Sequence, residues 1–338
     1  MAIISTVINS LELRQSTLTN WIKTIPIEYN LVSQLNIFNP VPIATTLVSV
    51  EPDETKARLV MAVPRGMNNY YPDGIKSNKN AVYFEVPHLP IRDPIVPSDI
   101  QNTRVGGDNV LISLREVVQE RLEKHKINLM STIEYLKIGA LRGQILNSDG
   151  TLLFDLFEKF NKNQTTVDFQ FSGLAEMQTK CNQVKRSIEL ALGMDTIRGF
   201  ACFASDAFFD EFTTQDSVKE AYAGYGLAEQ RLGGETRNGF SFGGITFYNY
   251  NPTIKNPSGG VVRFVPEGEA MFFPLGTRNT FQYIIAPANT MDTVNTRGVE
   301  FTSFSWVSED RQSLGIHSES NVLPLCTNPG VLVRGIGA

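Results

Sequence analysis

The sequence predicts an α+β protein with two domains and extended attachments. Three observations support this prediction: a helical apolar repeat over residues 111–140, short strands with frequent turn signals after residue 197, and a polar stretch over residues 65–80 with too few apolar residues to fold alone. A length of 338 residues with 42% hydrophobic residues is sufficient for a sizeable core. The elements are taken below in chain order.

Residues 1–43 alternate short apolar and polar patches and contain Pro26, Pro40 and Pro42. A compact core is not expected in such a segment. We therefore expect an extended N-terminal arm that lies on another surface.

Residues 44–92 predict a long β-loop. Two strand-like runs, 46–50 and 58–63, are joined by a turn, and a further strand over residues 81–86 brings the chain back. The polar tip between them has little apolar content, so we expect it to need a partner surface to become ordered.

The long helix is the most informative prediction. Its apolar stripe has steps of three and four residues, which average close to the helical period of 3.6. Charged residues flank the stripe, Asp108 can cap the helix, and Ser113 with Glu116 offers a capping box. A helix over about residues 108–143 is a rod of roughly 50 Å, which suits a mechanical spine. The stripe consists of Leu111, Leu114, Val118, Leu122, His125, Leu129, Ile133, Leu136 and Ala140.

After the helix, Ser148, Asp149 and Gly150 predict a tight hairpin. A second helix follows, with one face made of Leu174, Met177, Cys181, Val184, Ile188 and Leu192. From residue 197 we expect a second, α+β domain with short helices near Phe208 and Val218, a glycine-rich loop over 224–239, and strands over 200–203, 240–250, 261–265, 270–273 and 281–285.

Composition excludes several classes of protein. The formal net charge of -5 and the lack of a long basic run argue against a dedicated nucleic-acid reader. Cys181, Cys202 and Cys326 are widely spaced in apolar surroundings, which predicts buried free thiols in a reducing compartment. The sequence shows neither a signal peptide nor an apolar run that could span a membrane, so we expect a protein made and folded in a cytoplasm.

The sequence offers little catalytic or metal chemistry. His88, His125 and His317 lie far apart, and none has metal-ligand spacing with a cysteine or carboxylate. We expect a partly buried structural role for His125, a rigid extended segment around His88, and a polar loop around His317. The run 239–243 matches the pattern of a serine nucleophile elbow, but the residues after it predict a strand rather than the required helix. No catalytic residue, cofactor or metal ligand is therefore predicted.

Several phrases of the sequence resemble the major capsid proteins of tailed bacteriophages of the lambda capsid protein E family. They span about residues 44–338 in order, and none is diagnostic alone. They lie at residues 84–88, 99–104, 132–143, 239–250, 273–276, 286–288, 294–296 and 319–326.

The resemblance implies the Hong Kong 97-type capsid fold, an α+β fold with an N-terminal arm, an extended loop, a spine helix, and peripheral and axial domains. The expected boundaries are an arm over 1–43, the extended loop over 44–92, the peripheral domain with its spine helix over 93–195, the axial domain over 196–300, and a return to the peripheral domain over 301–338. The strand-like run 331–333 fits that return.

The resemblance also implies a function. The chain would be a major capsid protein, not an enzyme, that assembles with itself into hexamers and pentamers of an icosahedral shell around the phage double-stranded DNA, built in the host bacterial cytoplasm. An arm of about 40 residues is too short to contain a scaffolding domain, so a separate scaffolding protein is expected, with portal and decoration proteins as further partners. DNA would be contacted only non-specifically. The loop tip would contact neighbouring subunits through Arg65, Tyr70, Tyr71, Lys76 and Lys79.

Alternative functions remain open at this point. A shell protein of a cargo-enclosing nanocompartment, similar to the encapsulins, has the same fold. An enzyme of unknown class is disfavoured by the lack of a catalytic constellation. Lys76 and Lys79 make covalent cross-linking between subunits conceivable, although solvated lysines are far commoner.

Overall fold

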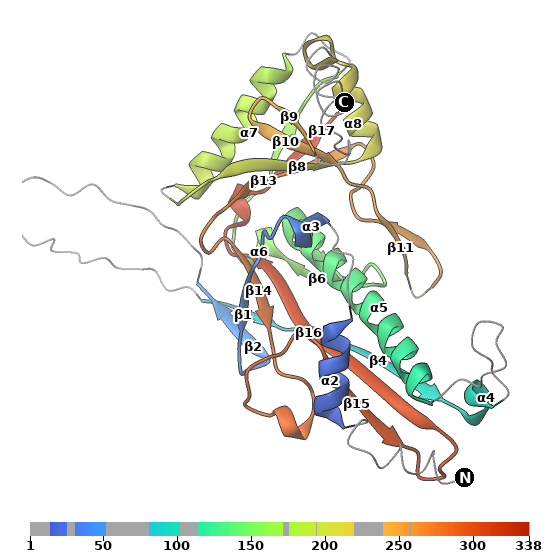
Figure 1. Ribbon diagram of the computed structural model, residues 1–338. Helices are drawn as coiled ribbons and strands as arrows, with labels where there is room; N and C mark the ends of the chain where they lie inside the picture. The colour runs from blue at the N-terminus through green and yellow to red at the C-terminus, as the bar shows by residue number, and fades with distance from the viewer. Residues whose placement is uncertain are drawn as a thin grey trace, which may run out of the picture. The chain divides into compact units, whose positions relative to one another are not determined.

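The chain forms two compact units in the computed structural model (Figure 1). Unit 1 comprises Met1–Val48, Glu85–Leu136 and Tyr283–Leu325, and unit 2 comprises Ser49–Phe84, Lys137–Gln282 and Cys326–Ala338. The structure describes residues 14–25, 31–51, 81–101, 114–171, 176–193, 195–219, 239–256 and 258–337.

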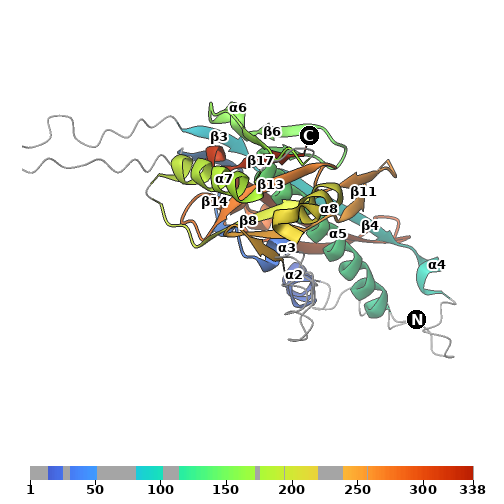
Figure 2. The same cartoon turned by 90° about the horizontal axis from the view of Figure 1, so that it is seen from above.

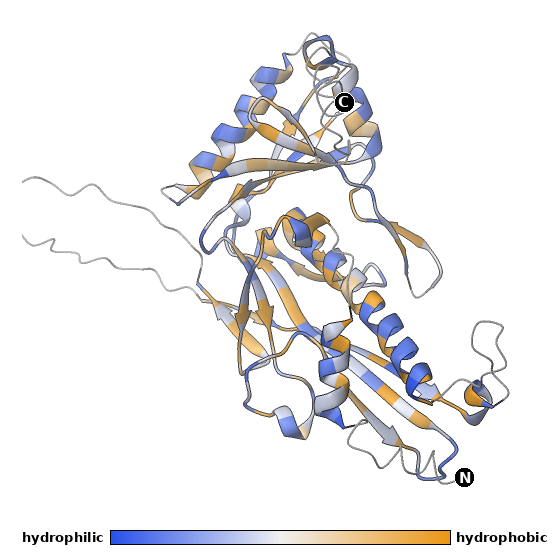
Figure 3. Cartoon of the chain, viewed as in Figure 1, coloured by the Kyte–Doolittle hydropathy of each residue, from blue (hydrophilic) through white to orange (hydrophobic). Residues whose placement is uncertain are grey.

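Unit 1 is built on a five-stranded sheet. The strand order is β1 (Asn39–Pro42), β14 (Phe281–Ile285), β16 (Leu314–Cys326) and β15 (Thr302–Val307), and β4 (His88–Ile95) also pairs with β16. Antiparallel ladders with β4 and β15 satisfy the two edges of β16 along its first half. All 13 residues of β16 are buried, although a run of five polar residues, 317–321, lies in its middle between apolar flanks (Figure 3).

The long helix α5 (Leu114–Arg142) confirms the predicted register. Every described member of the predicted stripe is buried. At its start the helix packs Leu114, Val118 and Leu122 against Ile316 of β16 and Ile95 of β4. Asp108 and Ser113, the expected capping residues, lie outside the described part of the chain. The helix ends before Gly143, whose φ of +80° an L side chain rarely adopts.

The described N-terminal residues correct the expected extended arm. Residues 14–25 contain a helix, α2 (Gln15–Thr24), whose Leu18 and Ile22 are fully buried. Leu18 belongs to the same core cluster as the start of α5, and Trp21 packs against it. A helix of ten residues is marginal alone, and its short apolar repeat gives a weak signal, so tertiary packing decides its structure.

Two buried charged residues of α5 bind this N-terminal segment. Lys126, expected on the charged flank of the helix, is only 2% exposed. Its ammonium group donates hydrogen bonds to the carbonyl oxygens of Lys23 (3.0 Å) and Ile25 (2.8 Å) at the C-terminal end of α2. The carboxylate of Glu134 accepts hydrogen bonds from the Val32 N–H (2.9 Å) and the Ser33 hydroxyl (3.0 Å) in the short helix α3 (Leu31–Gln34). The cation therefore lies at the negative end of α2 and satisfies carbonyl groups that the helix leaves unpaired.

The base of the predicted β-loop is confirmed. β2 (Leu47–Val50) and β3 (Val82–Glu85) form a two-stranded sheet, so the chain returns as a strand where residues 81–86 predicted one. The expected strand over residues 58–63 lies outside the described residues, as does the tip. A short helix, α4 (Pro97–Ile100), follows β4.

Unit 2 contains a six-stranded sheet flanked by two helices. The helices are α7 (Met177–Leu192) and α8 (Asp206–Thr214), both of which contact β13, and Figure 2 shows α7 beside this sheet. The predicted α7 face is buried except for Leu174, which lies outside the described residues. The strand order is β7 (Thr165–Asp168), β17 (Val333–Ile336), β13 (Glu269–Leu275), β8 (Gly199–Ala204), β10 (Ile245–Asn249) and β9 (Phe240–Phe242).

Phenylalanine rings fill the core of unit 2. Phe169 stacks on Phe272 with ring centroids 5.6 Å apart, and Phe212 stacks on Phe247 at 4.3 Å. Each of these side chains is nearly inaccessible to solvent. Such aromatic contacts add to the large apolar area that the rings bury.

The hairpins of unit 2 agree with the sequence in one case and correct it in another. β5 (Gln144–Leu146) and β6 (Leu152–Asp155) form the predicted hairpin, followed by α6 (Leu156–Lys159). The expected single strand over 240–250 is instead the hairpin β9–β10, because Gly243 and Gly244 both have positive φ. The remaining elements are β11 (Thr253–Lys255), β12 (Val261–Arg263) and the 3₁₀ turns η3 (Met291–Thr293) and η4 (Pro329–Val331).

The compact units group some segments differently from the expected domain boundaries. The second helix α7 and the last strand β17 belong to unit 2 with most of residues 196–282, whereas β15 and most of β16 belong to unit 1. β17 pairs with β13 and β7 in the six-stranded sheet. The run around residue 333 therefore completes the sheet of unit 2.

Candidate functional site

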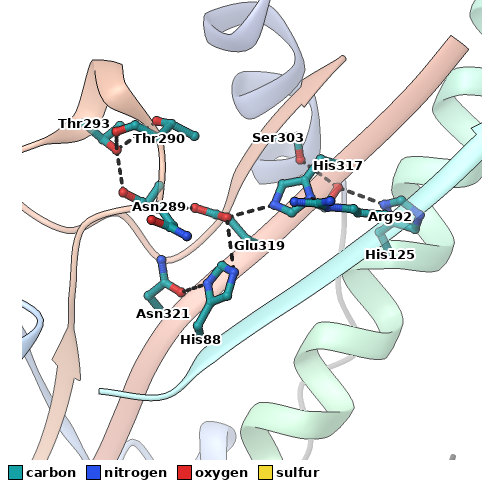
Figure 4. A network of polar contacts seen from close by, with 12 residues as sticks. His88, Arg92, His125, Asn289, Thr290, Thr293, Ser303, His317, Glu319 and Asn321 are labelled. Atoms are coloured by element: carbon teal, nitrogen blue, oxygen red, sulfur yellow. Dashed lines mark hydrogen bonds and ion pairs between the residues drawn. The ribbon is translucent and has the colours of Figure 1, made fainter. Parts of the chain in front are cut away.

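All three histidines of the chain meet around one strand ladder of unit 1 (Figure 4). His88 lies on β4, His125 on α5 and His317 on β16. The expectation of a polar loop at His317 is wrong, because this residue lies in the middle of the buried strand β16. The extended segment at His88 and the buried position of His125 agree with the prediction.

The alternation of β16 sends its polar side chains to two faces of the sheet. His317, Glu319 and Asn321 share one face, and Ser318 lies on the other. In the ladder with β4, Asn321 is opposite His88 and His317 is opposite Arg92. The register therefore brings together residues more than 200 positions apart.

Glu319 is the centre of the first face. Its side chain is 1% exposed, and one carboxylate oxygen lies 2.8 Å from His317 Nε2 and 3.9 Å from His88 Nε2. The other oxygen accepts a hydrogen bond from the Asn289 N–H at 2.5 Å. Because each carboxylate oxygen accepts a hydrogen bond, the buried charge is compensated.

The neighbours of this carboxylate fix the orientation of both imidazoles. Arg92 Nε donates to His317 Nδ1 at 3.3 Å, so the other ring nitrogen carries the proton and faces Glu319. His88 Nδ1 lies 2.7 Å from Asn321 Oδ1, and Asn321 Nδ2 donates to the Pro287 carbonyl at 2.9 Å. The network thus binds the segment after β14 to the middle of β16.

Electrostatics favour the ionised form of Glu319. Burial alone would raise the pKa of this carboxyl group, but the hydrogen bonds from His317 and from the Asn289 N–H outweigh it, and the pKa is lowered. The carboxylate therefore stays charged inside unit 1.

The second face centres on His125, between α5 and the sheet. His125 Nδ1 lies 2.9 Å from Ser318 Oγ, which lies 2.9 Å from Ser303 Oγ. Thr19 of α2 completes this chain with hydrogen bonds to the backbone of Ser303. Burial lowers the pKa of His125; the carboxylate of Asp93, 3.7 Å from Nε2, opposes the shift only in part.

Ser318, His125 and Asp93 carry the three groups of a serine hydrolase triad, a constellation that the sequence did not reveal. Ser318 and His125 are both buried, and the Ser318 hydroxyl is also engaged by Ser303. A triad works only when its hydroxyl can reach a substrate carbonyl. The geometry therefore supports a structural role. Ser241, in the sequence match to a nucleophile elbow, lies in strand β9 and not at a strand-to-helix turn.

The described residues contain no cluster of three histidine, cysteine, aspartate or glutamate side chains that could hold a metal ion. Cys181, Cys202 and Cys326 are buried free thiols, as predicted. Burial raises the pKa of Cys181 and of Cys326 to about 12. None of the helices in the described part of the chain is long and apolar enough to cross a membrane.

The predicted contact residues of the loop tip cannot be placed relative to this network, because they lie outside the described residues. They are Arg65, Tyr70, Tyr71, Lys76 and Lys79. The histidine network was missed because the run from His317 to Asn321 contains only polar residues and was interpreted as a loop. The signal that could have revealed the strand lies in the apolar residues on both sides of the run, Ile316 and Val322.

Comparison with known proteins identifies the class. A sequence model of the family described as Phage major capsid protein E matches residues 14–336. The chain is 27% identical to the major capsid protein of Pseudomonas phage KPP10, over 93% of this chain and 94% of that protein. It is 25% identical to the major capsid protein of Salmonella phage Felix O1, over 94% of each chain.

The fold agrees with a solved structure. A protein assigned as a prophage capsid protein of E. coli CFT073 superposes with a TM-score of 0.62 at 12% identity, over 96% of this chain and 99% of that one. The family match defines the chain as a phage capsid subunit, and its α+β structure with the long helix α5 agrees with the Hong Kong 97-type fold. The chain belongs to the Phage major capsid protein E family.

Proposed function

We propose that the chain builds the icosahedral head of a tailed phage by assembling with itself into hexamers and pentamers around double-stranded DNA. The family match over residues 14–336 carries this proposal. A capsid subunit is a structural protein, and its task is to contact other subunits.

The partition into units supports a division of labour. Unit 1, with α5 and the long strand β16, fits the peripheral domain, and unit 2, with its separate sheet, fits the axial domain near the symmetry axes. Ring and shell assembly uses heterologous contacts, in which one surface of a subunit meets a different surface of its neighbour. Several weak contacts per subunit then give a stable closed shell.

We propose that the loop between β2 and β3 extends to an adjacent subunit. Its base is a two-stranded ladder, and its tip carries Arg65, Tyr70, Tyr71, Lys76 and Lys79. Tyrosine and arginine are enriched at the energetic centres of protein interfaces. We propose that these five residues contact the adjacent subunit.

Further partners follow from the same proposal. A separate scaffolding protein, a portal and decoration proteins would act with the shell, which is assembled in the host cytoplasm. The net charge of -5 favours only weak, non-specific contact with packaged DNA.

Negative-stain electron microscopy of the protein expressed alone in bacteria tests the proposal. We expect hexameric rings or hollow closed particles. If the chain is instead the shell protein of a nanocompartment, particles purified from the organism that carries the gene should contain a specific cargo protein. The absence of rings and particles under all conditions would contradict both.

A further inference from the structure

The segment between β14 and β15 holds an apolar tip in solvent. Met291 is 92% exposed and Val294 is 58% exposed, and Met291 is the most exposed large apolar side chain among the described residues. Single exposed apolar residues are common on protein surfaces, so exposure alone decides nothing. The way in which this segment is held is informative.

The tip is a rigid turn. Thr293 Oγ1 donates to the Ala288 carbonyl at 2.6 Å, and the Thr293 N–H donates to the Thr290 carbonyl at 3.1 Å. Thr296 Oγ1 donates to the Thr293 carbonyl at 2.7 Å. These bonds bridge the two sides of the 3₁₀ turn η3, which carries Met291.

Both ends of the segment are fixed to the sheet. At the start, the Ala286 N–H donates to the Asn321 carbonyl at 2.8 Å, and the Asn289 N–H donates to the carboxylate of Glu319. At the end, the Gly298 N–H donates to the Ile43 carbonyl at 2.8 Å. Gly298 lies so close to β14 that a Cβ atom there would be 2.2 Å from the Ile285 carbonyl oxygen.

The turn is also bound to the buried network around Glu319. Burying Glu319 is unfavourable unless its partners are placed well, and one of those partners is the backbone of the exposed turn (Figure 4). A pre-organised apolar tip loses little conformational entropy when it binds, which raises affinity. Asp292 and Arg297 are also exposed, so the apolar centre has charges of both signs beside it, as in the core and rim of an interface.

We propose that the turn from Asn289 to Val299 is a contact with a second copy of this chain, and that Glu319, His317, His88 and Asn321 are its positioning residues. The second copy is the occupant because a capsid subunit must meet its own kind over several surfaces. This inference rests on the proposed function. It adds a contact that lies on unit 1, far in the sequence from the loop tip at residues 65–80.

Thiol labelling of the variant Met291→Cys tests the contact. Cys181, Cys202 and Cys326 are buried, so a cysteine at position 291 is the reactive thiol among the described residues. We expect maleimide to label it readily in unassembled subunits and about tenfold or more slowly in closed empty shells, because interface centres exclude water. Equal labelling rates in both states would overturn the proposal.

Assembly of two further variants gives an independent result. Met291→Asp should leave the subunit folded, with the urea midpoint of the parent, but should prevent closed shells, whereas Met291→Leu should assemble normally. Asp292→Asn is the matched control for a change of charge at the adjacent exposed position and should also assemble. If folded Met291→Asp forms shells as efficiently as the parent, the turn is not a contact.

The outcomes separate this inference from the proposed function. A parent protein that forms neither rings nor shells would contradict the capsid function itself. A parent that assembles while position 291 stays fully reactive in the shell would contradict only the contact at the turn.

Discussion

Single buried charges connect distant parts of unit 1. Lys126 binds the C-terminal end of α2, Glu134 binds α3, and Glu319 binds the turn after β14. In each case a charged side chain satisfies backbone groups of a segment that is remote in the sequence. Such a hydrogen bond is directional, so it defines the position of the segment more precisely than apolar contacts alone.

The stripe of α5 can be tested at one position. Leu122→Asp would bury an unpaired carboxylate among Leu18, Val118 and Ile316, at a cost of several kcal/mol, comparable with the stability of a domain. We expect insoluble or unfolded protein, measured by circular dichroism and by the soluble fraction. Lys124→Ala should cost little, because Lys124 is exposed and its ion pair with Glu120 lies on the surface. A soluble, folded Leu122→Asp protein would show that the stripe faces water.

Acid should destabilise unit 1 in two steps. Burial lowers the pKa of His125 in the folded state. The contribution of the neutral imidazole to the free energy of unfolding is therefore fully present above the ordinary pKa of about 6.5 and decreases as the pH falls below that value. The folded state also lowers the pKa of Glu319, so its contribution is present above about 4.3 and is lost as the pH falls through the lowered value. Urea unfolding between pH 7.5 and 5 should show the first step, and His125→Gln should flatten it. An unchanged slope in His125→Gln would refute the assignment.

At the scale of elements, the sequence predicted those whose apolar residues repeat regularly. The α5 stripe, the buried face of α7 and the hairpin at Gly150 all follow from local patterns. β16 could not be found in this way, because its polar residues are buried only after β4, β15 and the turn at Asn289 supply partners. Lys126 was expected on the exposed flank of the helix for the same reason, because the carbonyl groups that accept its hydrogen bonds belong to the N-terminal segment.

The docking of α2 predicts the effect of Lys126→Met. This change keeps the length of the side chain but removes the donor to the carbonyl groups of Lys23 and Ile25, at a cost of about 1–3 kcal/mol. We expect a lower urea midpoint and faster proteolysis within residues 14–25. Lys124→Met, two residues away and exposed, is the control. Equal protection of α2 in both variants would show that the bond to Lys126 does not hold the helix.

The proposed role of the loop tip predicts the effect of deleting residues 67–80. The tip has little apolar content and lies far in the sequence from both cores, so its loss should leave no cavity. We expect a soluble subunit with the thermal stability of the parent that does not close into shells. If the deletion variant assembles as well as the parent, the role proposed for the tip is wrong.

The whole molecule combines two compact units, each with its own sheet. Unit 1 has its five-stranded sheet and most of α5, and unit 2 has its own six-stranded sheet and aromatic core. The histidine network of unit 1 includes a hydrogen bond from the Asn289 N–H, which lies two residues before the exposed Met291. The family match shows a capsid protein, and the fold agrees with it.

Sedimentation velocity of the purified chain over a wide concentration range tests that central claim most directly. The account predicts boundaries that correspond to hexamers, pentamers or closed shells, with little free monomer at high concentration. A single sharp monomer boundary at every concentration, from a protein with native circular dichroism, would contradict it.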